Sequence, residues 1–259
     1  MTRELSSISR FGKTEPFGLQ VARGQITGHE VVHVFGYNPD VDGNEETVWP
    51  INGLLGHPES PTIMKISSTS ANDTAAGTGA RTVFIKGING TGGYATETVT
   101  LDGQSAVDTV NEYDAIESMV VLTAGSGEAN AGLIYAGTGT VTSGVPAVPY
   151  SVIAAGENQS LVGHWTCPKG FTGYLTHGKF TVGPTSGSQF VLGRLKLRLA
   201  SGLTITAAKT TISQGEVGYP FDYPIKISPG ECITATAQGS GSNNTVSSYF
   251  EIVLVRDAE

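Results

Sequence analysis

Residues 96–141 read TETVTLDGQSAVDTVNEYDAIESMVVLTAGSGEANAGLIYAGTGTV. Threonine and small β-forming residues alternate in this stretch, and glycines interrupt them at short intervals. Alternation of this kind is typical of half-buried strands, and the glycines are typical of the tight turns that join them. The stretch contains no pattern typical of a catalytic centre. It therefore favours an all-β structural protein over an enzyme.

A shorter stretch in the second half of the chain alternates more strictly. Residues 194–199 read RLKLRL, which places Arg194, Lys196 and Arg198 on one side of a strand and three leucines on the other. Further strand-like runs, separated by turn residues, lie at 160–166, 173–182, 223–227, 232–237 and 247–256. Together these strands predict an all-β fold, in which an N-terminal extended arm precedes two domains of the β-sandwich or jelly-roll type.

Glycines and prolines divide the chain into four segments. They interrupt residues 1–61 so often that this segment predicts an extended arm, with one strand candidate at 30–35, EVVHVF. Residues 62–142 predict a β-domain, and 150–259 predict a C-terminal β-sandwich of the jelly-roll type. Residues 143–149, SGVPAVP, predict a linker, because proline lacks the backbone donor that strand pairing needs.

One segment of the first β-domain is ambiguous. In residues 104–116 the apolar side chains have helical spacing, whereas the surrounding sequence is rich in strands. The sequence leaves open whether this segment forms a helix or a strand.

Charge and hydropathy exclude several classes of protein. The chain has 259 residues, a formal net charge of −8 and only 15% charged residues. An acidic chain poor in lysine and arginine lacks the basic surface of a nucleic-acid binder, and it is a poor match for an anionic membrane surface. No apolar run is long enough for a transmembrane helix, and the first residues do not resemble a secretion signal. We therefore expect folding in a cytosol, with no nucleic acid and no membrane as partner.

The two cysteines predict neither a disulfide nor a metal site. Cys167 and Cys232 are best interpreted as buried small hydrophobic residues. His164 lies three residues before Cys167, but no second pair of ligands accompanies Cys232. We expect no metal and no cofactor.

Two histidines in the arm could also bring ligands together. His29 and His33 lie in a strand-like run and project to the same side, where Glu46 or Asp40 could join them. A metal site needs at least three ligands, so packing of the arm is the preferred interpretation.

Catalytic motifs are lacking in the sequence. There is no Gly-x-Ser-x-Gly elbow, and no carboxylate stands within an apolar run that would raise its pKa. The sequence leaves open the alternative that two carboxylates from different strands come together in the folded protein. The sequence therefore predicts a protein that is not an enzyme, with no catalytic residue.

Several segments of the chain resemble proteins of tailed bacteriophages. These segments are VARGQITGHEVVHVFGYNPDVD (21–42), SSTSANDTAAGTGARTVFIKGING (67–90), ETVTLDGQSAVDTVNEY and VLTAGSGEANAGLI, in that order. The resemblance covers residues 21–141 and is to uncharacterised virion components, especially marine ones. The second half resembles, more loosely, a C-terminal β-domain attached to such proteins, through SVIAAGENQS, GHWTCPKGFTGYLTHGKFTV and VSSYFEIVLV. This resemblance implies a structural role in the virion and no catalytic residue.

These expectations lead to a functional hypothesis. We expect a non-enzymatic virion protein, assembled in the host cytoplasm, that acts as a capsid decoration, cement or head-fibre component. The alternative is a tail-associated fibre or adaptor protein whose C-terminal sandwich contacts other tail proteins or a host glycan. The expected partners are major capsid or tail proteins and further copies of the chain, for example in a trimer, because an arm that cannot bury itself needs another surface.

Two groups of residues are candidates for these contacts. The arm is expected to dock on the particle through Arg23, His29, His33, Phe35 and Tyr37. Aromatic residues of the sandwich are candidates for contact with a glycan or partner, with core packing as the alternative, namely Trp165, Tyr174, Tyr219 and Tyr223.

Overall fold

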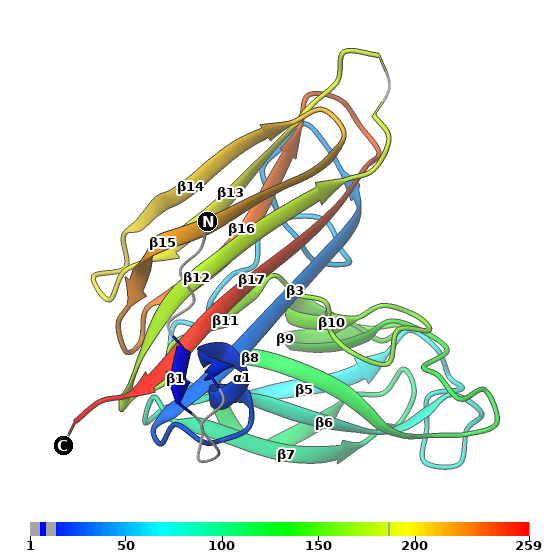
Figure 1. Cartoon of the computed structure of the whole chain (residues 1–259). Coiled ribbons are helices and arrows are strands. Elements are labelled where there is room, and N and C mark those ends of the chain that lie inside the picture. Colours follow the sequence, from blue (N-terminus) through cyan, green and yellow to red (C-terminus); the bar gives the residue numbers. More distant parts are fainter. Residues whose placement is uncertain (1–5, 9–13, 186, 259) are drawn as a thin grey trace.

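The computed structural model describes residues 6–8, 14–185 and 187–258. Within these residues the chain forms three antiparallel sheets, a two-stranded pair of β1 (Ser6–Ile8) and β2 (Thr14–Pro16), and one short helix, α1 (Phe17–Ala22). The predicted all-β fold class is confirmed. In this described part no helix is long and apolar enough to cross a membrane. Figure 1 shows a sandwich of two sheets and, beside it, a curled sheet.

The sandwich packs two sheets face to face. One sheet has the order β15-β12-β17-β3, and the other has the order β11-β16-β13-β14, with β4 paired to β16. The strands are β3 (His29–Val41), β4 (Glu46–Thr47), β11 (His164–Thr166), β12 (Phe171–Val182), β13 (Val191–Arg198), β14 (Thr204–Ile212), β15 (Gly215–Ile227), β16 (Cys232–Gly239) and β17 (Asn244–Arg256). As the alternation predicts, Leu195 and Leu197 of β13 are buried, and they join Phe180, Phe250 and Ile252 in one core.

The other unit is a single six-stranded sheet that curls around its own core. It has the order β10-β9-β5-β8-β6-β7. Its strands are β5 (Thr62–Ser68), β6 (Ala80–Asn89), β7 (Tyr94–Thr100), β8 (Val107–Ala124), β9 (Ile134–Thr142) and β10 (Val145–Ile153). The long strand β8 pairs with β5 through its first half and with β6 through its second half, which bends the sheet around Met64, Ile66 and Met119. Most of the ambiguous segment 104–116 is therefore strand.

The structure differs from the expected arm at residues 29–49. Strand β3 pairs with β17 from His29 opposite Val255 to Val41 opposite Asn244, so it is an edge strand of the sandwich (Figure 1). The reason is that β3 has its own apolar face: Val34 and Val41 point into the sandwich core. Residues 1–5 and 9–13 of the expected arm lie outside the described residues.

Gly36 shows how closely this strand is integrated. A Cβ atom at this position would lie 2.4 Å from the carbonyl oxygen of Val48 and 2.8 Å from the Cα atom of Gly163. These are backbone atoms of two other segments, which cross β3 at this point. Only glycine allows such an approach, so β3 is fixed within the fold and does not lie loosely on it.

The expected linker at 143–149 is also different in the structure. Its residues form the turn into β10 and the first half of that strand, which pairs with β9. The pairing register shifts between Pro146 and Val148 and again between Pro149 and Ser151. Because β10 is at the edge of the sheet, its prolines face no further strand, and bulges absorb the missing donors.

A small apolar cluster joins the sandwich to the curled sheet. Trp49, which follows β4, packs with Tyr135 of β9, Val152 of β10 and Val162. All four side chains are buried, and the Trp49 indole donates a hydrogen bond to the Gly53 carbonyl at 3.0 Å. The two units are therefore packed against each other through apolar surface as well as through the chain that connects them.

Candidate functional site

An aromatic groove lies on the outer face of the sheet β15-β12-β17-β3. Alternation along β3 sends Val34 into the core and places His33, Phe35 and Tyr37 on the opposite face. Strand pairing sets Tyr249 of β17 directly opposite Phe35. The sequence groups the three β3 side chains among the candidate contact residues, whereas nothing local predicts that Tyr249 joins them.

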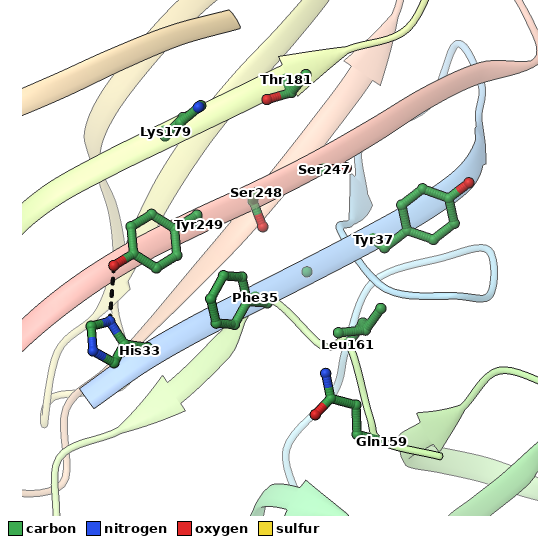
Figure 2. Close-up of a pocket in the computed structure, with 11 residues that line it drawn as sticks. His33, Phe35, Tyr37, Gln159, Leu161, Lys179, Thr181, Ser247, Ser248 and Tyr249 are labelled. Carbon is green, nitrogen blue, oxygen red and sulfur yellow. Dashed lines mark hydrogen bonds between the residues drawn. The ribbon is translucent and has the colours of Figure 1, made fainter. Parts of the chain in front are cut away.

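The aromatic side chains of the groove contact one another. The rings of Phe35 and Tyr249 have centroids 4.9 Å apart, and the His33 ring stacks on Tyr249 at 6.0 Å with an interplanar angle of 15°. The His33 Nδ1 atom and the Tyr249 hydroxyl form a hydrogen bond of 2.8 Å, which Figure 2 marks with a dashed line. The hydroxyl of Tyr249 also donates to the Glu251 carboxylate at 3.1 Å. These contacts fix the rings in place before any partner arrives.

Polar residues and a chain segment complete the groove. Lys179 and Thr181 of β12 line one side, and Gln159 and Leu161, from the segment that leads into the sandwich, line the other (Figure 2). The groove has a volume of about 770 Å³ and an apolar lining. Phe35 stays 51% exposed at its centre, although a ring of this size is usually covered. An exposed aromatic surface in a concave site is typical of a contact surface.

The groove continues into a cleft between the sandwich and the curled sheet. His33, Phe35, Gln159 and Leu161 line both cavities. Residues from both units line the deeper part, namely Lys86, Tyr94, Glu117, Ser118, Met119, Val120, Ser160, Val162, His164 and Trp165. The cleft therefore lies where the two units meet, and a molecule in the groove would contact both of them.

Hydrogen bonds across this cleft tie the two units together. Both carboxylate oxygens of Glu117, on β8, accept a hydrogen bond from the backbone nitrogen of Thr166, on β11, at 3.1 Å. The Trp165 indole donates to the Tyr94 hydroxyl at 3.3 Å, and the Lys86 ammonium lies 3.8 Å from the centroid of the Tyr94 ring. Burial raises the pKa of the Tyr94 hydroxyl, so it stays protonated.

The sequence did not indicate that Glu117 has a carboxyl group with a raised pKa. Burial raises its pKa from 4.5 to about 8, and the hydrogen bonds from Thr166 and the nearby Lys86 only partly oppose this. The expectation that no carboxylate has such surroundings is therefore wrong. Glu117 lines the cleft between the two units and is in contact with Thr166 of the sandwich, which is 49 residues away in the sequence.

Replacing Glu117 by glutamine is expected to remove a loss of stability at high pH. The folded pKa of about 8 lies above the unfolded value of 4.5. The stabilising contribution of the protonated carboxyl is therefore fully present below the unfolded pKa and is lost as the pH rises through the folded pKa. Tm should be measured for E117Q and the wild type at about pH 5 and at about pH 9. The Tm of E117Q relative to that of the wild type should be higher at about pH 9 than at about pH 5. The control is E112Q, an exposed carboxylate of the same strand; an equal shift in both variants would contradict the assignment.

The other candidate contact residues of β3 and the arm lie away from the groove. Arg23 follows α1 and forms an ion pair with Glu15, in which its guanidinium lies 2.5 Å from the carboxylate. His29 begins β3, and its ring contacts Phe17 edge-on at 6.1 Å. The structure therefore brings together His33, Phe35 and Tyr37 but not Arg23 or His29.

The aromatic candidates of the sandwich are dispersed. Trp165 is 2% exposed and packs in the sandwich core, whereas Tyr223 on β15 is 91% exposed. Tyr174 on β12 and Tyr219 on β15 are half-buried. Only Trp165 reaches the interdomain cleft, from its deep end.

His164 and Cys167 do not form a pair of ligands. Three positions apart in extended chain, they point to opposite faces of the sheet, and Cys167 lies in the sandwich core. His164 instead lies close to two residues from other segments, His57 and Cys232. The ligand atoms of the three residues all lie within 4.8 Å of one another. This cluster could hold a metal ion, and the sequence did not predict it because its members are far apart along the chain.

Burial controls the protonation of the cluster. Burial, helped by the positive charge of Arg198, lowers the pKa of His57 to about 4. Burial, helped by His57 and then by Arg198, lowers the pKa of His164 to about 3. Burial also raises the pKa of the Cys232 thiol to about 12. At neutral pH the cluster therefore contains two neutral imidazoles and a thiol.

Comparisons with known proteins include a weak structural likeness. No family model matches the chain. No curated protein matches it either. Among solved structures, the chain is similar to a chain of the Cowpea mosaic virus top component, naturally occurring empty particles, with 11% sequence identity and a TM-score of 0.21 over 79% of this chain and 84% of that chain. This is a weak structural similarity to a viral capsid protein, too small to carry an argument about function.

Proposed function

We propose that this chain is a non-enzymatic structural protein of a bacteriophage virion, a capsid decoration, cement or head-fibre component. In this proposal the aromatic groove of His33, Phe35, Tyr37 and Tyr249 binds a neighbouring virion protein. The observation that carries the proposal is this groove, with Phe35 half-exposed at its centre. Several segments of residues 21–141 resemble segments of virion components in the same order, which supports a location in a virion.

An uncovered aromatic groove leaves apolar surface in contact with water, which a bound partner would remove. Aromatic side chains provide large apolar area at a small entropic cost, and they dominate the energetics of protein interfaces. The groove presents such side chains on a fixed sheet, with polar residues such as Lys179 and Gln159 at its margin. A buried aromatic centre with a polar rim is the usual anatomy of a protein–protein contact. Further copies of the chain in a homo-oligomer, for example a trimer, would present several such grooves together.

The groove also favours one second candidate function. A tail-associated fibre or adaptor protein that binds a host glycan would use stacked aromatic rings beside hydrogen-bonding side chains, and Tyr249 lies near Gln159 and Thr181 in the same groove. The number of copies of the protein per virion distinguishes a location on the capsid from a location on the tail. Hundreds of copies per virion would support capsid decoration, and a few tens or fewer would support a tail-associated part.

Replacing Phe35 by alanine tests the groove directly. The variant is expected to lose about 2 kcal/mol of binding free energy, which is roughly 30-fold in affinity, because the ring lies at the centre of the contact. Its stability should change by less than about 1 kcal/mol, since half of the ring is already in water. Incorporation into particles and Tm are the two measurements.

The matched control is Y223A, which removes an aromatic ring that is 91% exposed on β15, outside the groove. Y223A should be incorporated like the wild type. Normal incorporation of both variants would contradict the proposal that the groove binds the particle. Normal incorporation of F35A together with lost binding to host polysaccharide would favour the glycan function instead.

A further inference from the structure

Three segments bring metal-binding side chains to the outer face of one sheet of the sandwich. β11 and β16 pair so that His164 is opposite Thr234 and Thr166 is opposite Cys232. These four residues point away from the sandwich core, because their neighbours Trp165 and Ile233 point into it. The segment between β4 and β5 passes over this face and places His57 next to Cys232.

The distances fit one ion with tetrahedral coordination. The Cys232 Sγ atom lies 3.6 Å from the His57 Nε2 atom. Bond lengths of about 2.3 Å for zinc–sulfur and about 2.0–2.1 Å for zinc–nitrogen, at tetrahedral angles, separate these two ligand atoms by about 3.5 Å. The third ligand, His164, lies within 4.8 Å of both, and the centroids of the two imidazole rings are 5.2 Å apart. Binding of all three ligands to one ion would bring a His164 ring nitrogen closer to the other two ligand atoms and replace its hydrogen bond to one threonine.

Neighbouring hydroxyl groups orient the His164 ring. The Thr234 hydroxyl lies 2.8 Å from Nδ1 and the Thr166 hydroxyl lies 3.2 Å from Nε2. Metal-binding histidines in proteins usually form a hydrogen bond through the second ring nitrogen, which fixes the tautomer and the ring orientation. Thr234 supplies this partner if Nε2 binds the ion, and Thr166 supplies it if Nδ1 does.

A cavity gives access to the cluster. It has a volume of about 510 Å³ and is lined by His57 and Cys232 together with Glu59, Asp114 and Arg198. The carboxylates of Glu59 and Asp114 lower the cost of bringing in a cation, whereas the Arg198 guanidinium and the Lys169 ammonium, which also line the cavity, raise it. The thiolate of Cys232 adds a further negative charge when an ion binds. The cavity is wide enough to admit a water molecule as a fourth ligand.

We propose that His57, His164 and Cys232 bind one zinc ion, with a water molecule as the fourth ligand. Two imidazoles and a thiolate suit zinc and other late transition-metal ions, whereas magnesium and calcium prefer oxygen ligands. Binding replaces the thiol proton, so that Cys–SH and Zn²⁺ give Cys–S–Zn⁺ and one H⁺. The ion links the segment that carries His57 to strands β11 and β16, next to the surface where Asp114 of the curled sheet packs. It stabilises the junction between the two units.

Titration of the full chain with metal ions tests the site. After treatment with a chelator and its removal, the protein should bind one equivalent of cobalt(II), with an absorption band from thiolate-to-cobalt charge transfer. Zinc(II) should displace the cobalt. Added to the metal-free protein instead, zinc(II) should release about one proton per ion and raise Tm. A chain that shows no saturable binding, or binding without the charge-transfer band, would refute the site.

The chain offers a matched control for each ligand. The only other cysteine is Cys167, so the band should persist in C167A and vanish in C232A. H57A should weaken zinc binding at least about tenfold, whereas H29A, which changes a histidine at the start of β3, should leave it unchanged. If C232A does not fold, C167A alone decides the matter, because any remaining band must come from Cys232. Loss of the band in a folded C167A variant, or equal zinc binding in H57A and H29A, would overturn the proposal.

Discussion

A chain that lacks residues 1–61 is expected to lose the folded sandwich, whereas a chain that lacks residues 1–23 is expected to retain it. The longer deletion removes β3, β4 and Trp49. The shorter one leaves every strand of the three sheets in place. Near-ultraviolet circular dichroism and the cooperativity of thermal unfolding would distinguish a folded core from a collapsed chain.

The size of this effect follows from what β3 and β4 cover. Val34, Val41 and the adjoining Val48 are buried in the sandwich core. Full burial of each such side chain contributes about 1.5–3 kcal/mol, so three of them approach the total stability of about 5–15 kcal/mol of a typical domain. Their removal also exposes β17 as a bare edge with an apolar face, which favours aggregation. Cooperative unfolding of the 62–259 chain at the Tm of the full chain would contradict this account.

Local alternation predicted much of the fold. The strict pattern of RLKLRL in β13 predicted which of its side chains point inward, and β17 shows the same alternation of buried and partly exposed residues. The same rule explains why His33, Phe35 and Tyr37 share one face of β3. The prediction for β13 succeeds because the face of a residue in a strand depends only on its position along that strand.

Strand pairing could not be predicted in the same way. β3 pairs with β17 near the other end of the chain, and the side chains of His33 and Tyr249, which form a hydrogen bond, are 216 residues apart in the sequence. Frequent glycines and prolines in residues 1–61 therefore marked loops between strands, and not an arm without a core. Likewise, the prolines of β10 are tolerated because it is an edge strand, which only the sheet order reveals.

The chemistry of the candidate sites depends on the same long-range contacts. Cys232 and His57 are 175 residues apart in the sequence, and Glu117, whose pKa is raised by burial, contacts Thr166, which is 49 residues away. Spacing rules for metal sites work when the ligands share a short motif. In this chain each ligand comes from a different segment, so only the folded structure places them together.

Replacing Asp73 by alanine is expected to destabilise the curled sheet by about 4 kcal/mol or more. The Asp73 carboxylate is fully buried. One of its oxygens accepts hydrogen bonds from the backbone nitrogens of Ala80 at 2.7 Å and Ala131 at 2.8 Å. The other accepts from the backbone nitrogen of Gly132 at 3.0 Å and from the Ser68 hydroxyl at 2.5 Å.

The alanine variant leaves all four of these donors without their acceptor in a site closed to water. Each buried donor without a partner costs about 1–3 kcal/mol, and the carboxylate also holds the loop before β6 against the turn before β9. The control is D108A, whose carboxylate is 59% exposed and forms an ion pair with Lys65 at 2.9 Å. Such a surface pair contributes at most about 1 kcal/mol. Urea unfolding should therefore separate the two variants widely, and equal midpoints for D73A and D108A would show that the buried carboxylate does not hold these loops together.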